Sequence, residues 1–353
     1  MSWPLADPRW VERYAFDARS LAVARMVFAL FLGFVVDLPE LTFIAELPAD
    51  LWTPPPGPMQ LVTSPPSSWL MLGLIAAIEA LNVLVAVGWR TRATSLALAG
   101  TLALAYGLSF GTGKVNHNLL LWMTPLFLSG QWGRAWSVDA LVGRERPTVD
   151  PLPIACFALV VGFCMFSAGL AKLVGGWLDP HTPATYGHLI QNFYVAERTD
   201  WLAPAVLAIR SPLLWEALDW LTCLWEIGFL FAVLSPLWLR GFMAIAVLFH
   251  CSVWLIFNID FSANLVAYAV FVPWIESQAT EPTIDRPRAG RVLAVAVPVA
   301  VLAVLAPSPL LLLRDAVAIP RLPGAIALVV AASITAMFVA RGAWRRLSSS
   351  NHQ

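Results

Sequence analysis

The sequence predicts an all-α protein, a polytopic transmembrane bundle of about ten helices with both termini in the cytoplasm. Composition is the first observation: hydrophobic residues make up 59% of the chain and charged residues only 12%, with a mean hydropathy of +0.73. Soluble domains carry about 25% charged residues. A core of this size cannot bury so much apolar surface, so lipid must cover part of it. The net charge of zero argues against nucleic acid as a partner.

Apolar segments separated by polar loops are the second observation, and they place the helices. They lie at about 20–38, 68–88, 93–110, 115–130, 153–173, 214–234, 240–257, 262–275, 291–313 and 322–340. A perpendicular helix needs about 20 residues to cross a bilayer. The segments 115–130 and 262–275 are shorter, which leaves tilted, re-entrant and buried arrangements open for them. The first segment lacks a cleavage site with small residues, so we expect a retained helix rather than a signal peptide.

Two long loops interrupt the predicted bundle. The loop at 39–67 is rich in proline, with Pro54, Pro55, Pro56, Pro58, Pro65 and Pro66 among its residues, so we expect it to be ordered but non-helical over much of its length. The loop at 174–213 contains His181, His188 and an amphipathic stretch near 184–196. A loop of this length inside a compact membrane domain is usually functional.

The distribution of basic residues predicts the orientation. With the N-terminus in the cytoplasm, the inner loops and tails hold more than twice as many Lys and Arg residues as the outer loops, as the positive-inside rule requires. Both long loops then face outward. The same topology gathers many polar residues at the outer end of the bundle: Lys114, His117, Lys172, His181, His188, His250, Asn258 and Asp260.

Lysine usage is the sharpest oddity of the composition, because Lys114 and Lys172 are the two lysines among 22 basic residues. Arginine keeps its proton in proteins, whereas a desolvated lysine can lose it. Lys172 ends an apolar run whose small residues at 168–171 would let another helix approach closely. Two interpretations stay open: a partly buried amine that acts as a general base, or a lysine whose ammonium group reaches out to the membrane surface.

Two histidines lie at or inside apolar runs. His117 follows a polar loop, and His250 comes late in its segment. A histidine that faces lipid is costly, so we expect both to point into the bundle or a wet cavity, with either a ligand or a backbone carbonyl as partner. His181 and His188 have no carboxylate or thiolate pair nearby, so we expect no metal site.

Among the charged residues within the predicted spans are Arg25, Glu79 and Glu226. Buried charges in a bilayer generally pair. We therefore expect Arg25 to pair with Glu79 or Glu226 as a structural contact, and a role in a substrate site is the alternative. The sequence contains no phosphate-binding loop, nucleophile elbow, zinc-protease helix or dinucleotide fingerprint.

Six short motifs follow one another along residues 17–275. They are DARSLAVARMVFALFLGFVVDLPE at 17–40, VGWRTR at 87–92, NH at 116–117, WSVDAL at 136–141, AGLAKL at 168–173 followed by Trp177, and FHC at 249–251. In this order they resemble the membrane part of the vitamin K-dependent γ-glutamyl carboxylases. They also resemble the shorter bacterial proteins that contain only that part, the horizontally transferred transmembrane domain (HTTM).

The resemblance implies a domain organisation. Residues 17–275 would form the carboxylase-like transmembrane domain, and 291–340 would add two C-terminal transmembrane helices. Residues 1–16 and 341–353 would be cytoplasmic tails. The active site of the family faces the lumen, topologically outside, which agrees with the orientation that the basic residues predict.

The resemblance also implies a chemistry. In the family, the lysine that matches Lys172 deprotonates reduced vitamin K, which then reacts with oxygen. The strongly basic intermediate removes a proton from the γ-carbon of a glutamate, and carbon dioxide adds to the carbanion. Lys172 would therefore be the catalytic base, while Asn116, His117, Trp177 and His250 would bind the quinone or its intermediate. Reduced quinone (vitamin K or menaquinol), oxygen and carbon dioxide are the expected co-substrates.

Full-length carboxylases continue into a large lumenal region that presents glutamates, and the chain after residue 275 has no room for it. We therefore expect a membrane-embedded, carboxylase-like enzyme that epoxidises a quinol and removes a proton from, or carboxylates, an unknown substrate. Its site would face outward from a bacterial cytoplasmic membrane. One alternative is a non-catalytic membrane factor for maturation of a small secreted peptide. Another is a transporter, although transporters more often show broken helices in two repeated halves.

Overall fold

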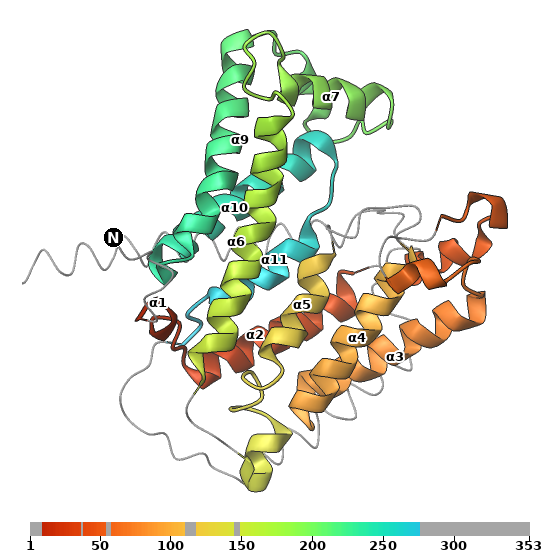
Figure 1. Ribbon diagram of the computed structural model, residues 1–353, viewed down its shortest axis with the longest axis vertical. Helices are drawn as coiled ribbons and strands as arrows, with labels where there is room; N and C mark the ends of the chain where they lie inside the picture. Colours follow the sequence, from red (N-terminus) through yellow and green to blue (C-terminus); the bar gives the residue numbers. More distant parts are fainter. Residues whose placement is uncertain (1–8, 37, 54–57, 110–117, 145–148, 276–353) are drawn as a thin grey trace, which may run out of the picture. The chain divides into compact units, whose positions relative to one another are not determined.

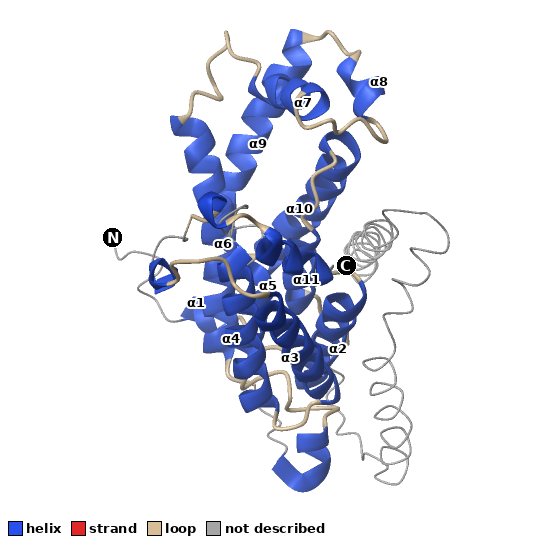
Figure 2. Ribbon diagram, turned by 90° about the vertical axis from the view of Figure 1, so that its right-hand side faces the viewer, coloured by secondary structure: helices blue, strands red, loops and turns tan. Residues whose placement is uncertain are grey.

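The computed structural model describes residues 9–36, 38–53, 58–109, 118–144 and 149–275. Helices and turns make up the regular structure of these ranges, and no strand occurs within them (Figures 1 and 2). The predicted all-α class is therefore confirmed for this part of the chain. The predicted helices at 291–313 and 322–340 lie outside the described residues, and the orientation of the termini stays a prediction.

The described helices follow the apolar segments closely. In chain order, the α-helices are α1 (Arg9–Glu12), α2 (Ala18–Phe34), α3 (Ser68–Val87), α4 (Thr91–Ser109), α5 (Leu119–Leu128), α6 (Pro151–Val174), α7 (Ala184–Tyr194), α8 (Ala203–Leu207), α9 (Pro212–Ala232), α10 (Pro236–Phe257) and α11 (Ser262–Tyr268). Shorter helical turns are η2 (Pro39–Glu46), η3 (Ala49–Leu51), η4 (Pro58–Leu61), η7 (Ala140–Arg144) and η8 (Ala269–Phe271). Each predicted segment from 20–38 to 262–275 thus contains a helix.

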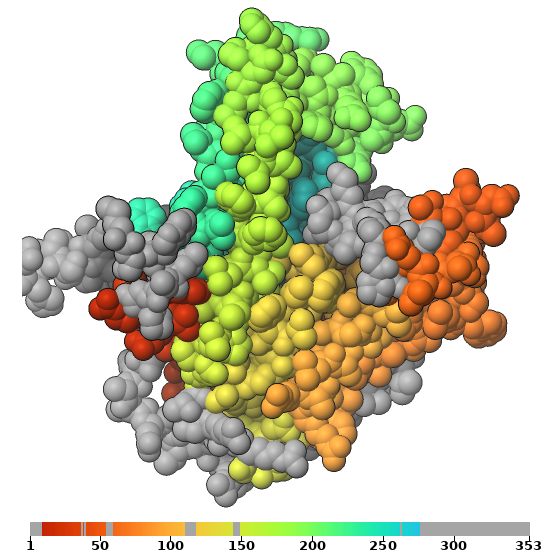
Figure 3. All heavy atoms as spheres, viewed as in Figure 1, coloured from red at the N-terminus to blue at the C-terminus, as the bar shows by residue number. Residues whose placement is uncertain are grey.

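Three of these helices, α3, α6 and α10, are long and apolar enough to cross a membrane. They also expose large apolar side chains: Trp69 is 84% exposed on α3, and Leu237 is 77% exposed on α10. The side chains of α6 form a continuous strip at the surface, yellow-green in Figure 3. Phe163 on this helix is 60% exposed. Such surfaces are stable in contact with lipid rather than water. The protein is therefore a membrane protein.

The two long loops contain short helices. The loop at 39–67, expected to be largely non-helical, forms the 3₁₀ turns η2, η3 and η4, and Pro39 and Pro58 begin the first and last of them. Proline lacks an N–H group and is tolerated in the first turn of a helix, which explains why these turns start there. The amphipathic stretch near 184–196 forms α7, as its pattern predicted.

The chain divides into two compact units. We call residues 14–157 together with 266–275 the α2–α5 unit, and residues 9–13 together with 158–265 the α7–α10 unit. Consecutive helices pack against one another in the α2–α5 unit, α2 on α3, α3 on α4 and α4 on α5. In the α7–α10 unit, α9 packs on α7 and α10, and α8 contacts α7 and α10.

Arg25 lies at the centre of the α2–α5 unit and is fully buried. Its Nη1 atom donates to the carbonyl of Trp132 at 2.6 Å and more weakly to that of Ala135 at 3.5 Å, and Nη2 donates to the carbonyl of Trp136. The expected pairing with Glu79 or Glu226 is not what the structure shows. The turn after α5 exposes several backbone carbonyls in one direction, and the five donors of a guanidinium group suit such a set.

The same turn is fastened to the start of α4. Asp139 accepts hydrogen bonds from the backbone N–H groups of Arg90 at 2.9 Å and Thr91 at 2.7 Å, and its own N–H donates to the carbonyl of Gly88. Gly88 has a φ of 72°, and a Cβ atom there would lie 2.3 Å from the Cβ of Ser137. Only glycine fits this contact. The motifs at 87–92 and 136–141 therefore build the fold of the α2–α5 unit.

Candidate functional site

The candidate site is in the α7–α10 unit, where α6 and α9 approach each other at two glycines. A Cβ atom at Gly169 would lie 2.8 Å from the Cβ of Glu226, and one at Gly162 would lie 2.6 Å from a methyl group of Val233. The two glycines are seven residues apart, so they share one face of α6. Small residues near Lys172 thus allow α9 to approach, in the way that the sequence suggested.

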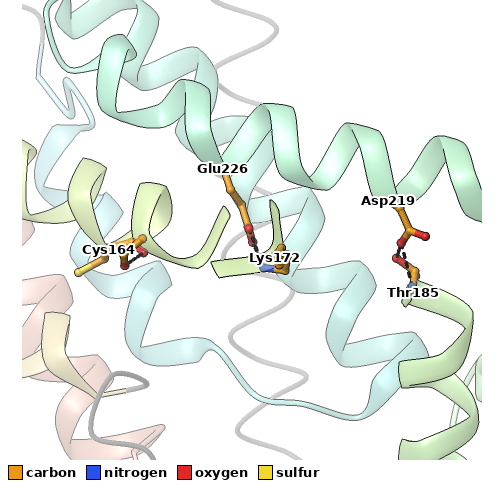
Figure 4. A network of polar contacts seen from close by, with 6 residues as sticks. Cys164, Lys172, Thr185, Asp219 and Glu226 are labelled. Carbon is orange, nitrogen blue, oxygen red and sulfur yellow. Dashed lines mark hydrogen bonds and ion pairs between the residues drawn. The ribbon is translucent and has the colours of Figure 1, made fainter. Parts of the chain in front are cut away.

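Lys172 and Glu226 form an ion pair across this contact. The Nζ atom of Lys172 lies 2.7 Å from Oε1 and 2.6 Å from Oε2 of Glu226 (Figure 4). The carboxylate is almost completely buried, with 4% of its side chain exposed, whereas 21% of the lysine side chain remains exposed. Glu226 therefore contacts Lys172 and not Arg25, which belongs to the other unit. A carboxylate in an apolar bundle requires such a partner.

An aromatic side chain lies beside the ammonium group. The Nζ atom of Lys172 is 5.2 Å from the ring centroid of Trp177, within the range of a cation–π contact. α6 ends in two glycines, and Gly176 has a φ of 81°. The N–H of Trp177 then donates back to the carbonyl of Lys172 at 3.1 Å. This glycine turn reverses the chain and places the indole ring of Trp177 beside the Lys172 side chain.

Asp219 holds α7 against α9. It is fully buried, and its carboxylate accepts from the backbone N–H groups of Ala184 at 3.0 Å and Thr185 at 2.8 Å, and from the Thr185 hydroxyl. A small apolar core of Leu189, Leu207 and Trp215 packs beneath. The ring of His188, on α7, lies 5.2 Å from that of Trp177. Asp219 therefore caps α7 and holds this helix where His188 contacts Trp177.

One face of α9 therefore carries two buried carboxylates with different partners. Asp219 and Glu226 are seven residues apart, about 10 Å along the helix, and both leave α9 on the same side in Figure 4. Sequence reasoning missed Asp219. The available signal was a pair of acidic residues at a spacing of seven in an apolar segment, which indicates one polar face.

Replacing Asp219 by asparagine is expected to lower the free energy of unfolding by about 1–3 kcal/mol, because the amide nitrogen cannot accept from a backbone N–H. The N-terminal turn of α7 should open, so limited proteolysis should cleave near residues 184–194 faster than in the wild type. The matched control is Glu216→Gln on the same helix, whose carboxylate accepts from the Trp220 indole at 2.9 Å and touches no α7 residue in the described structure. Equal cleavage of D219N and wild type would contradict the capping role.

His250 is buried in α10, with 4% exposure, in keeping with the expectation that it does not face lipid. Its ring stacks on Phe261, with centroids 4.9 Å apart, and meets Phe249 edge-on. His250, Lys172 and Trp177 belong to the same compact unit.

The other candidate residues lie elsewhere. Asn116 and His117 are outside the described residues. Arg25 and the half-buried Glu79 belong to the α2–α5 unit. Asn258 ends α10 in a left-handed conformation and holds the backbone of Asp200, with its Oδ1 atom 2.9 Å from that N–H. Its function is to fix the loop before α8.

Comparison with known proteins agrees with this picture. A family model described as the HTTM domain matches residues 14–273, which cover most of both units and the Lys172–Glu226 pair. No curated protein and no solved structure matches the chain. The six motifs therefore predicted the family correctly. The chain belongs to the HTTM domain family and contains a membrane domain related to that of the vitamin K-dependent carboxylases.

Proposed function

We propose that the protein is a membrane-embedded enzyme that oxidises a reduced quinone to its epoxide, with Lys172 as the base. The observation that supports this function best is the place of the Lys172 amine. It lies partly exposed at the end of α6, against a buried carboxylate and beside an indole ring. Family membership over residues 14–273 supports the same chemistry.

The residues around Lys172 suit an apolar aromatic molecule that carries a hydroxyl group. Trp177 offers an aromatic face, and the large apolar side chains of α6 and α10 keep water scarce. Lys172 accepts the hydroxyl proton, and Glu226 holds the amine in place through both of its carboxyl oxygens. His250, together with Asn116 and His117, is the further candidate for binding. When bound, the quinol supplies the electrons that reduce oxygen.

The proposed reaction also has a second substrate, the acceptor of carbon dioxide. The strong base formed during quinol oxidation removes a proton from a second substrate, to which carbon dioxide adds. A small secreted peptide or protein is the proposed acceptor class, because the site faces outward from a bacterial cytoplasmic membrane in the orientation that the basic residues favour.

The purified protein in detergent, supplied with reduced menaquinone or reduced vitamin K in air, is expected to consume oxygen and to form quinone epoxide. Oxygen uptake with an electrode and epoxide by chromatography should rise together, since they report the same turnover. Heat-denatured protein gives the rate of spontaneous quinol oxidation and is subtracted. An uptake no faster than this background, with either quinol, would count against the enzyme.

The ion pair itself favours a second candidate, a membrane factor without catalysis that assists maturation of a secreted peptide. Both oxygens of Glu226 contact Lys172, and a bidentate pair between two helices is also a common structural contact. The two candidates differ in what an arginine at position 172 would do, because arginine preserves the pair and cannot serve as a base.

A further inference from the structure

We infer that Glu226 is a positioning residue that controls whether the amine of Lys172 holds its proton. For catalysis the inference rests on the proposed function, since it gives the base of that reaction its partner. As a statement about the Lys172–Glu226 pair, it stands on geometry alone and can be tested without any quinol.

The contact between the two side chains is short and nearly symmetric. Nζ lies 2.6 Å from one carboxylate oxygen and 2.7 Å from the other, and Gly169 brings the backbones close enough for this. The carboxylate is 4% exposed, so water does not replace the amine as its partner. Charge-assisted hydrogen bonds of this length are about twice as strong as neutral ones.

Other titratable groups that interact electrostatically with the pair are Cys223 on α9 and His250 on α10, and Cys223 in turn interacts with Asp219 on α9. The hydrogen bonds and the ion pair described for Nζ join it to Glu226. The oxygens of Asp219 are occupied by the N-terminus of α7, and Trp177 contacts both Lys172 and His188. Glu226 is therefore the titratable group in direct contact with the amine.

A proton of the Lys172 ammonium group can pass directly to the carboxylate of Glu226. An ammonium beside a carboxylate cannot accept a further proton. Transfer of one proton from Nζ to a carboxylate oxygen breaks an N–H bond, forms an O–H bond and leaves a neutral amine beside a carboxylic acid. Entry of an apolar molecule that displaces water favours this neutral form, because separated charges are costly in an apolar medium. The amine then takes the hydroxyl proton of the substrate.

The experiment follows the reactivity of the Lys172 amine, which can be isolated because Lys114 and Lys172 are the two lysines of the sequence. In a Lys114→Arg background Lys172 is the one ε-amine, and its reaction with formaldehyde and borane can be followed by mass spectrometry across pH. Glu226→Gln keeps a hydrogen-bond acceptor and loses the charge. The midpoint of labelling is expected to move to lower pH by about one unit or more. Glu216→Gln is the matched control and should leave the midpoint in place.

Each outcome has a definite meaning. An unchanged midpoint in a folded E226Q protein, checked by gel filtration and thermal unfolding, would overturn the inference. If E226Q does not fold, Glu226→Asp decides: its carboxylate is one methylene farther away, so a smaller downward shift is expected, and no shift would overturn the inference equally. A shifted midpoint in a protein that does not oxidise quinol would leave the pair intact and reject the proposed function. In an active enzyme, the rising limb of the pH–rate profile should move to lower pH with the labelling midpoint.

Discussion

Replacing Lys172 by arginine is expected to lower quinol-dependent oxygen consumption by at least about 100-fold while the protein stays folded. Arginine retains the positive charge that the buried carboxylate of Glu226 requires, so the ion pair between α6 and α9 survives. A guanidinium group does not give up its proton in a protein, so the base is lost. Initial rates of oxygen uptake, measured beside thermal unfolding of the same samples, test both parts of this expectation.

The arginine variant separates loss of the base from loss of the ion pair, which an alanine variant does not. Lys172→Ala also removes the base, but it leaves Glu226 buried without its cation, and loss of one partner of a buried pair is strongly destabilising. The matched control is Lys114→Arg, which makes the same change at the other lysine. Full activity of K172R would exclude Lys172 as the base. A stable K172R beside an unfolded K172A, with no quinol turnover in the wild type, would favour the non-catalytic membrane factor.

The apolar segments of the sequence predicted the described helices well, because lipid imposes a length and a composition on every helix that crosses it. The segments 153–173 and 240–257 match α6 and α10 to within a few residues at each end. Lys172 could also be singled out from the sequence, because lysine is rare in this chain and small residues, Gly169 among them, precede it. Its role as a base stays a prediction from the family motifs.

The partners of the buried charges could not be predicted in the same way. Hydropathy identifies which residues lie in a helix, and it does not identify the helix that packs against it, so Glu226 could equally have faced Arg25 or Lys172. Hydrogen bonds from buried charges to backbone groups are harder still to predict. The two terminal nitrogens of Arg25 donate to the carbonyls of Trp132 and Trp136, and Asp219 accepts from the N–H groups that begin α7. No side-chain pattern records the direction of a carbonyl or an N–H group in a turn.

Arg25 therefore supports the second large prediction, which concerns stability. Arg25→Met preserves much of the side-chain volume and removes every donor, leaving the buried carbonyl of Trp132 and the part-buried carbonyl of Trp136 beside an apolar group. The free energy of unfolding is expected to fall by about 3–5 kcal/mol, since each unsatisfied buried carbonyl costs about 1–3 kcal/mol. Thermal or denaturant unfolding in detergent, followed by circular dichroism, measures the loss.

Arg19 provides the control on the same helix, because its side chain is 30% exposed and its ion pair with Asp17 is 3.6 Å long. Arg19→Met should change stability by no more than about 0.5 kcal/mol. Arg25→Lys should lie between wild type and R25M, because a single ammonium group cannot follow the fork of carbonyls that two guanidinium nitrogens reach. The turn that Arg25 holds also contains Asp139, which caps α4, so R25M should weaken α4 as well. An R25M protein with the same free energy of unfolding as the wild type would mean that water or another group satisfies these carbonyls.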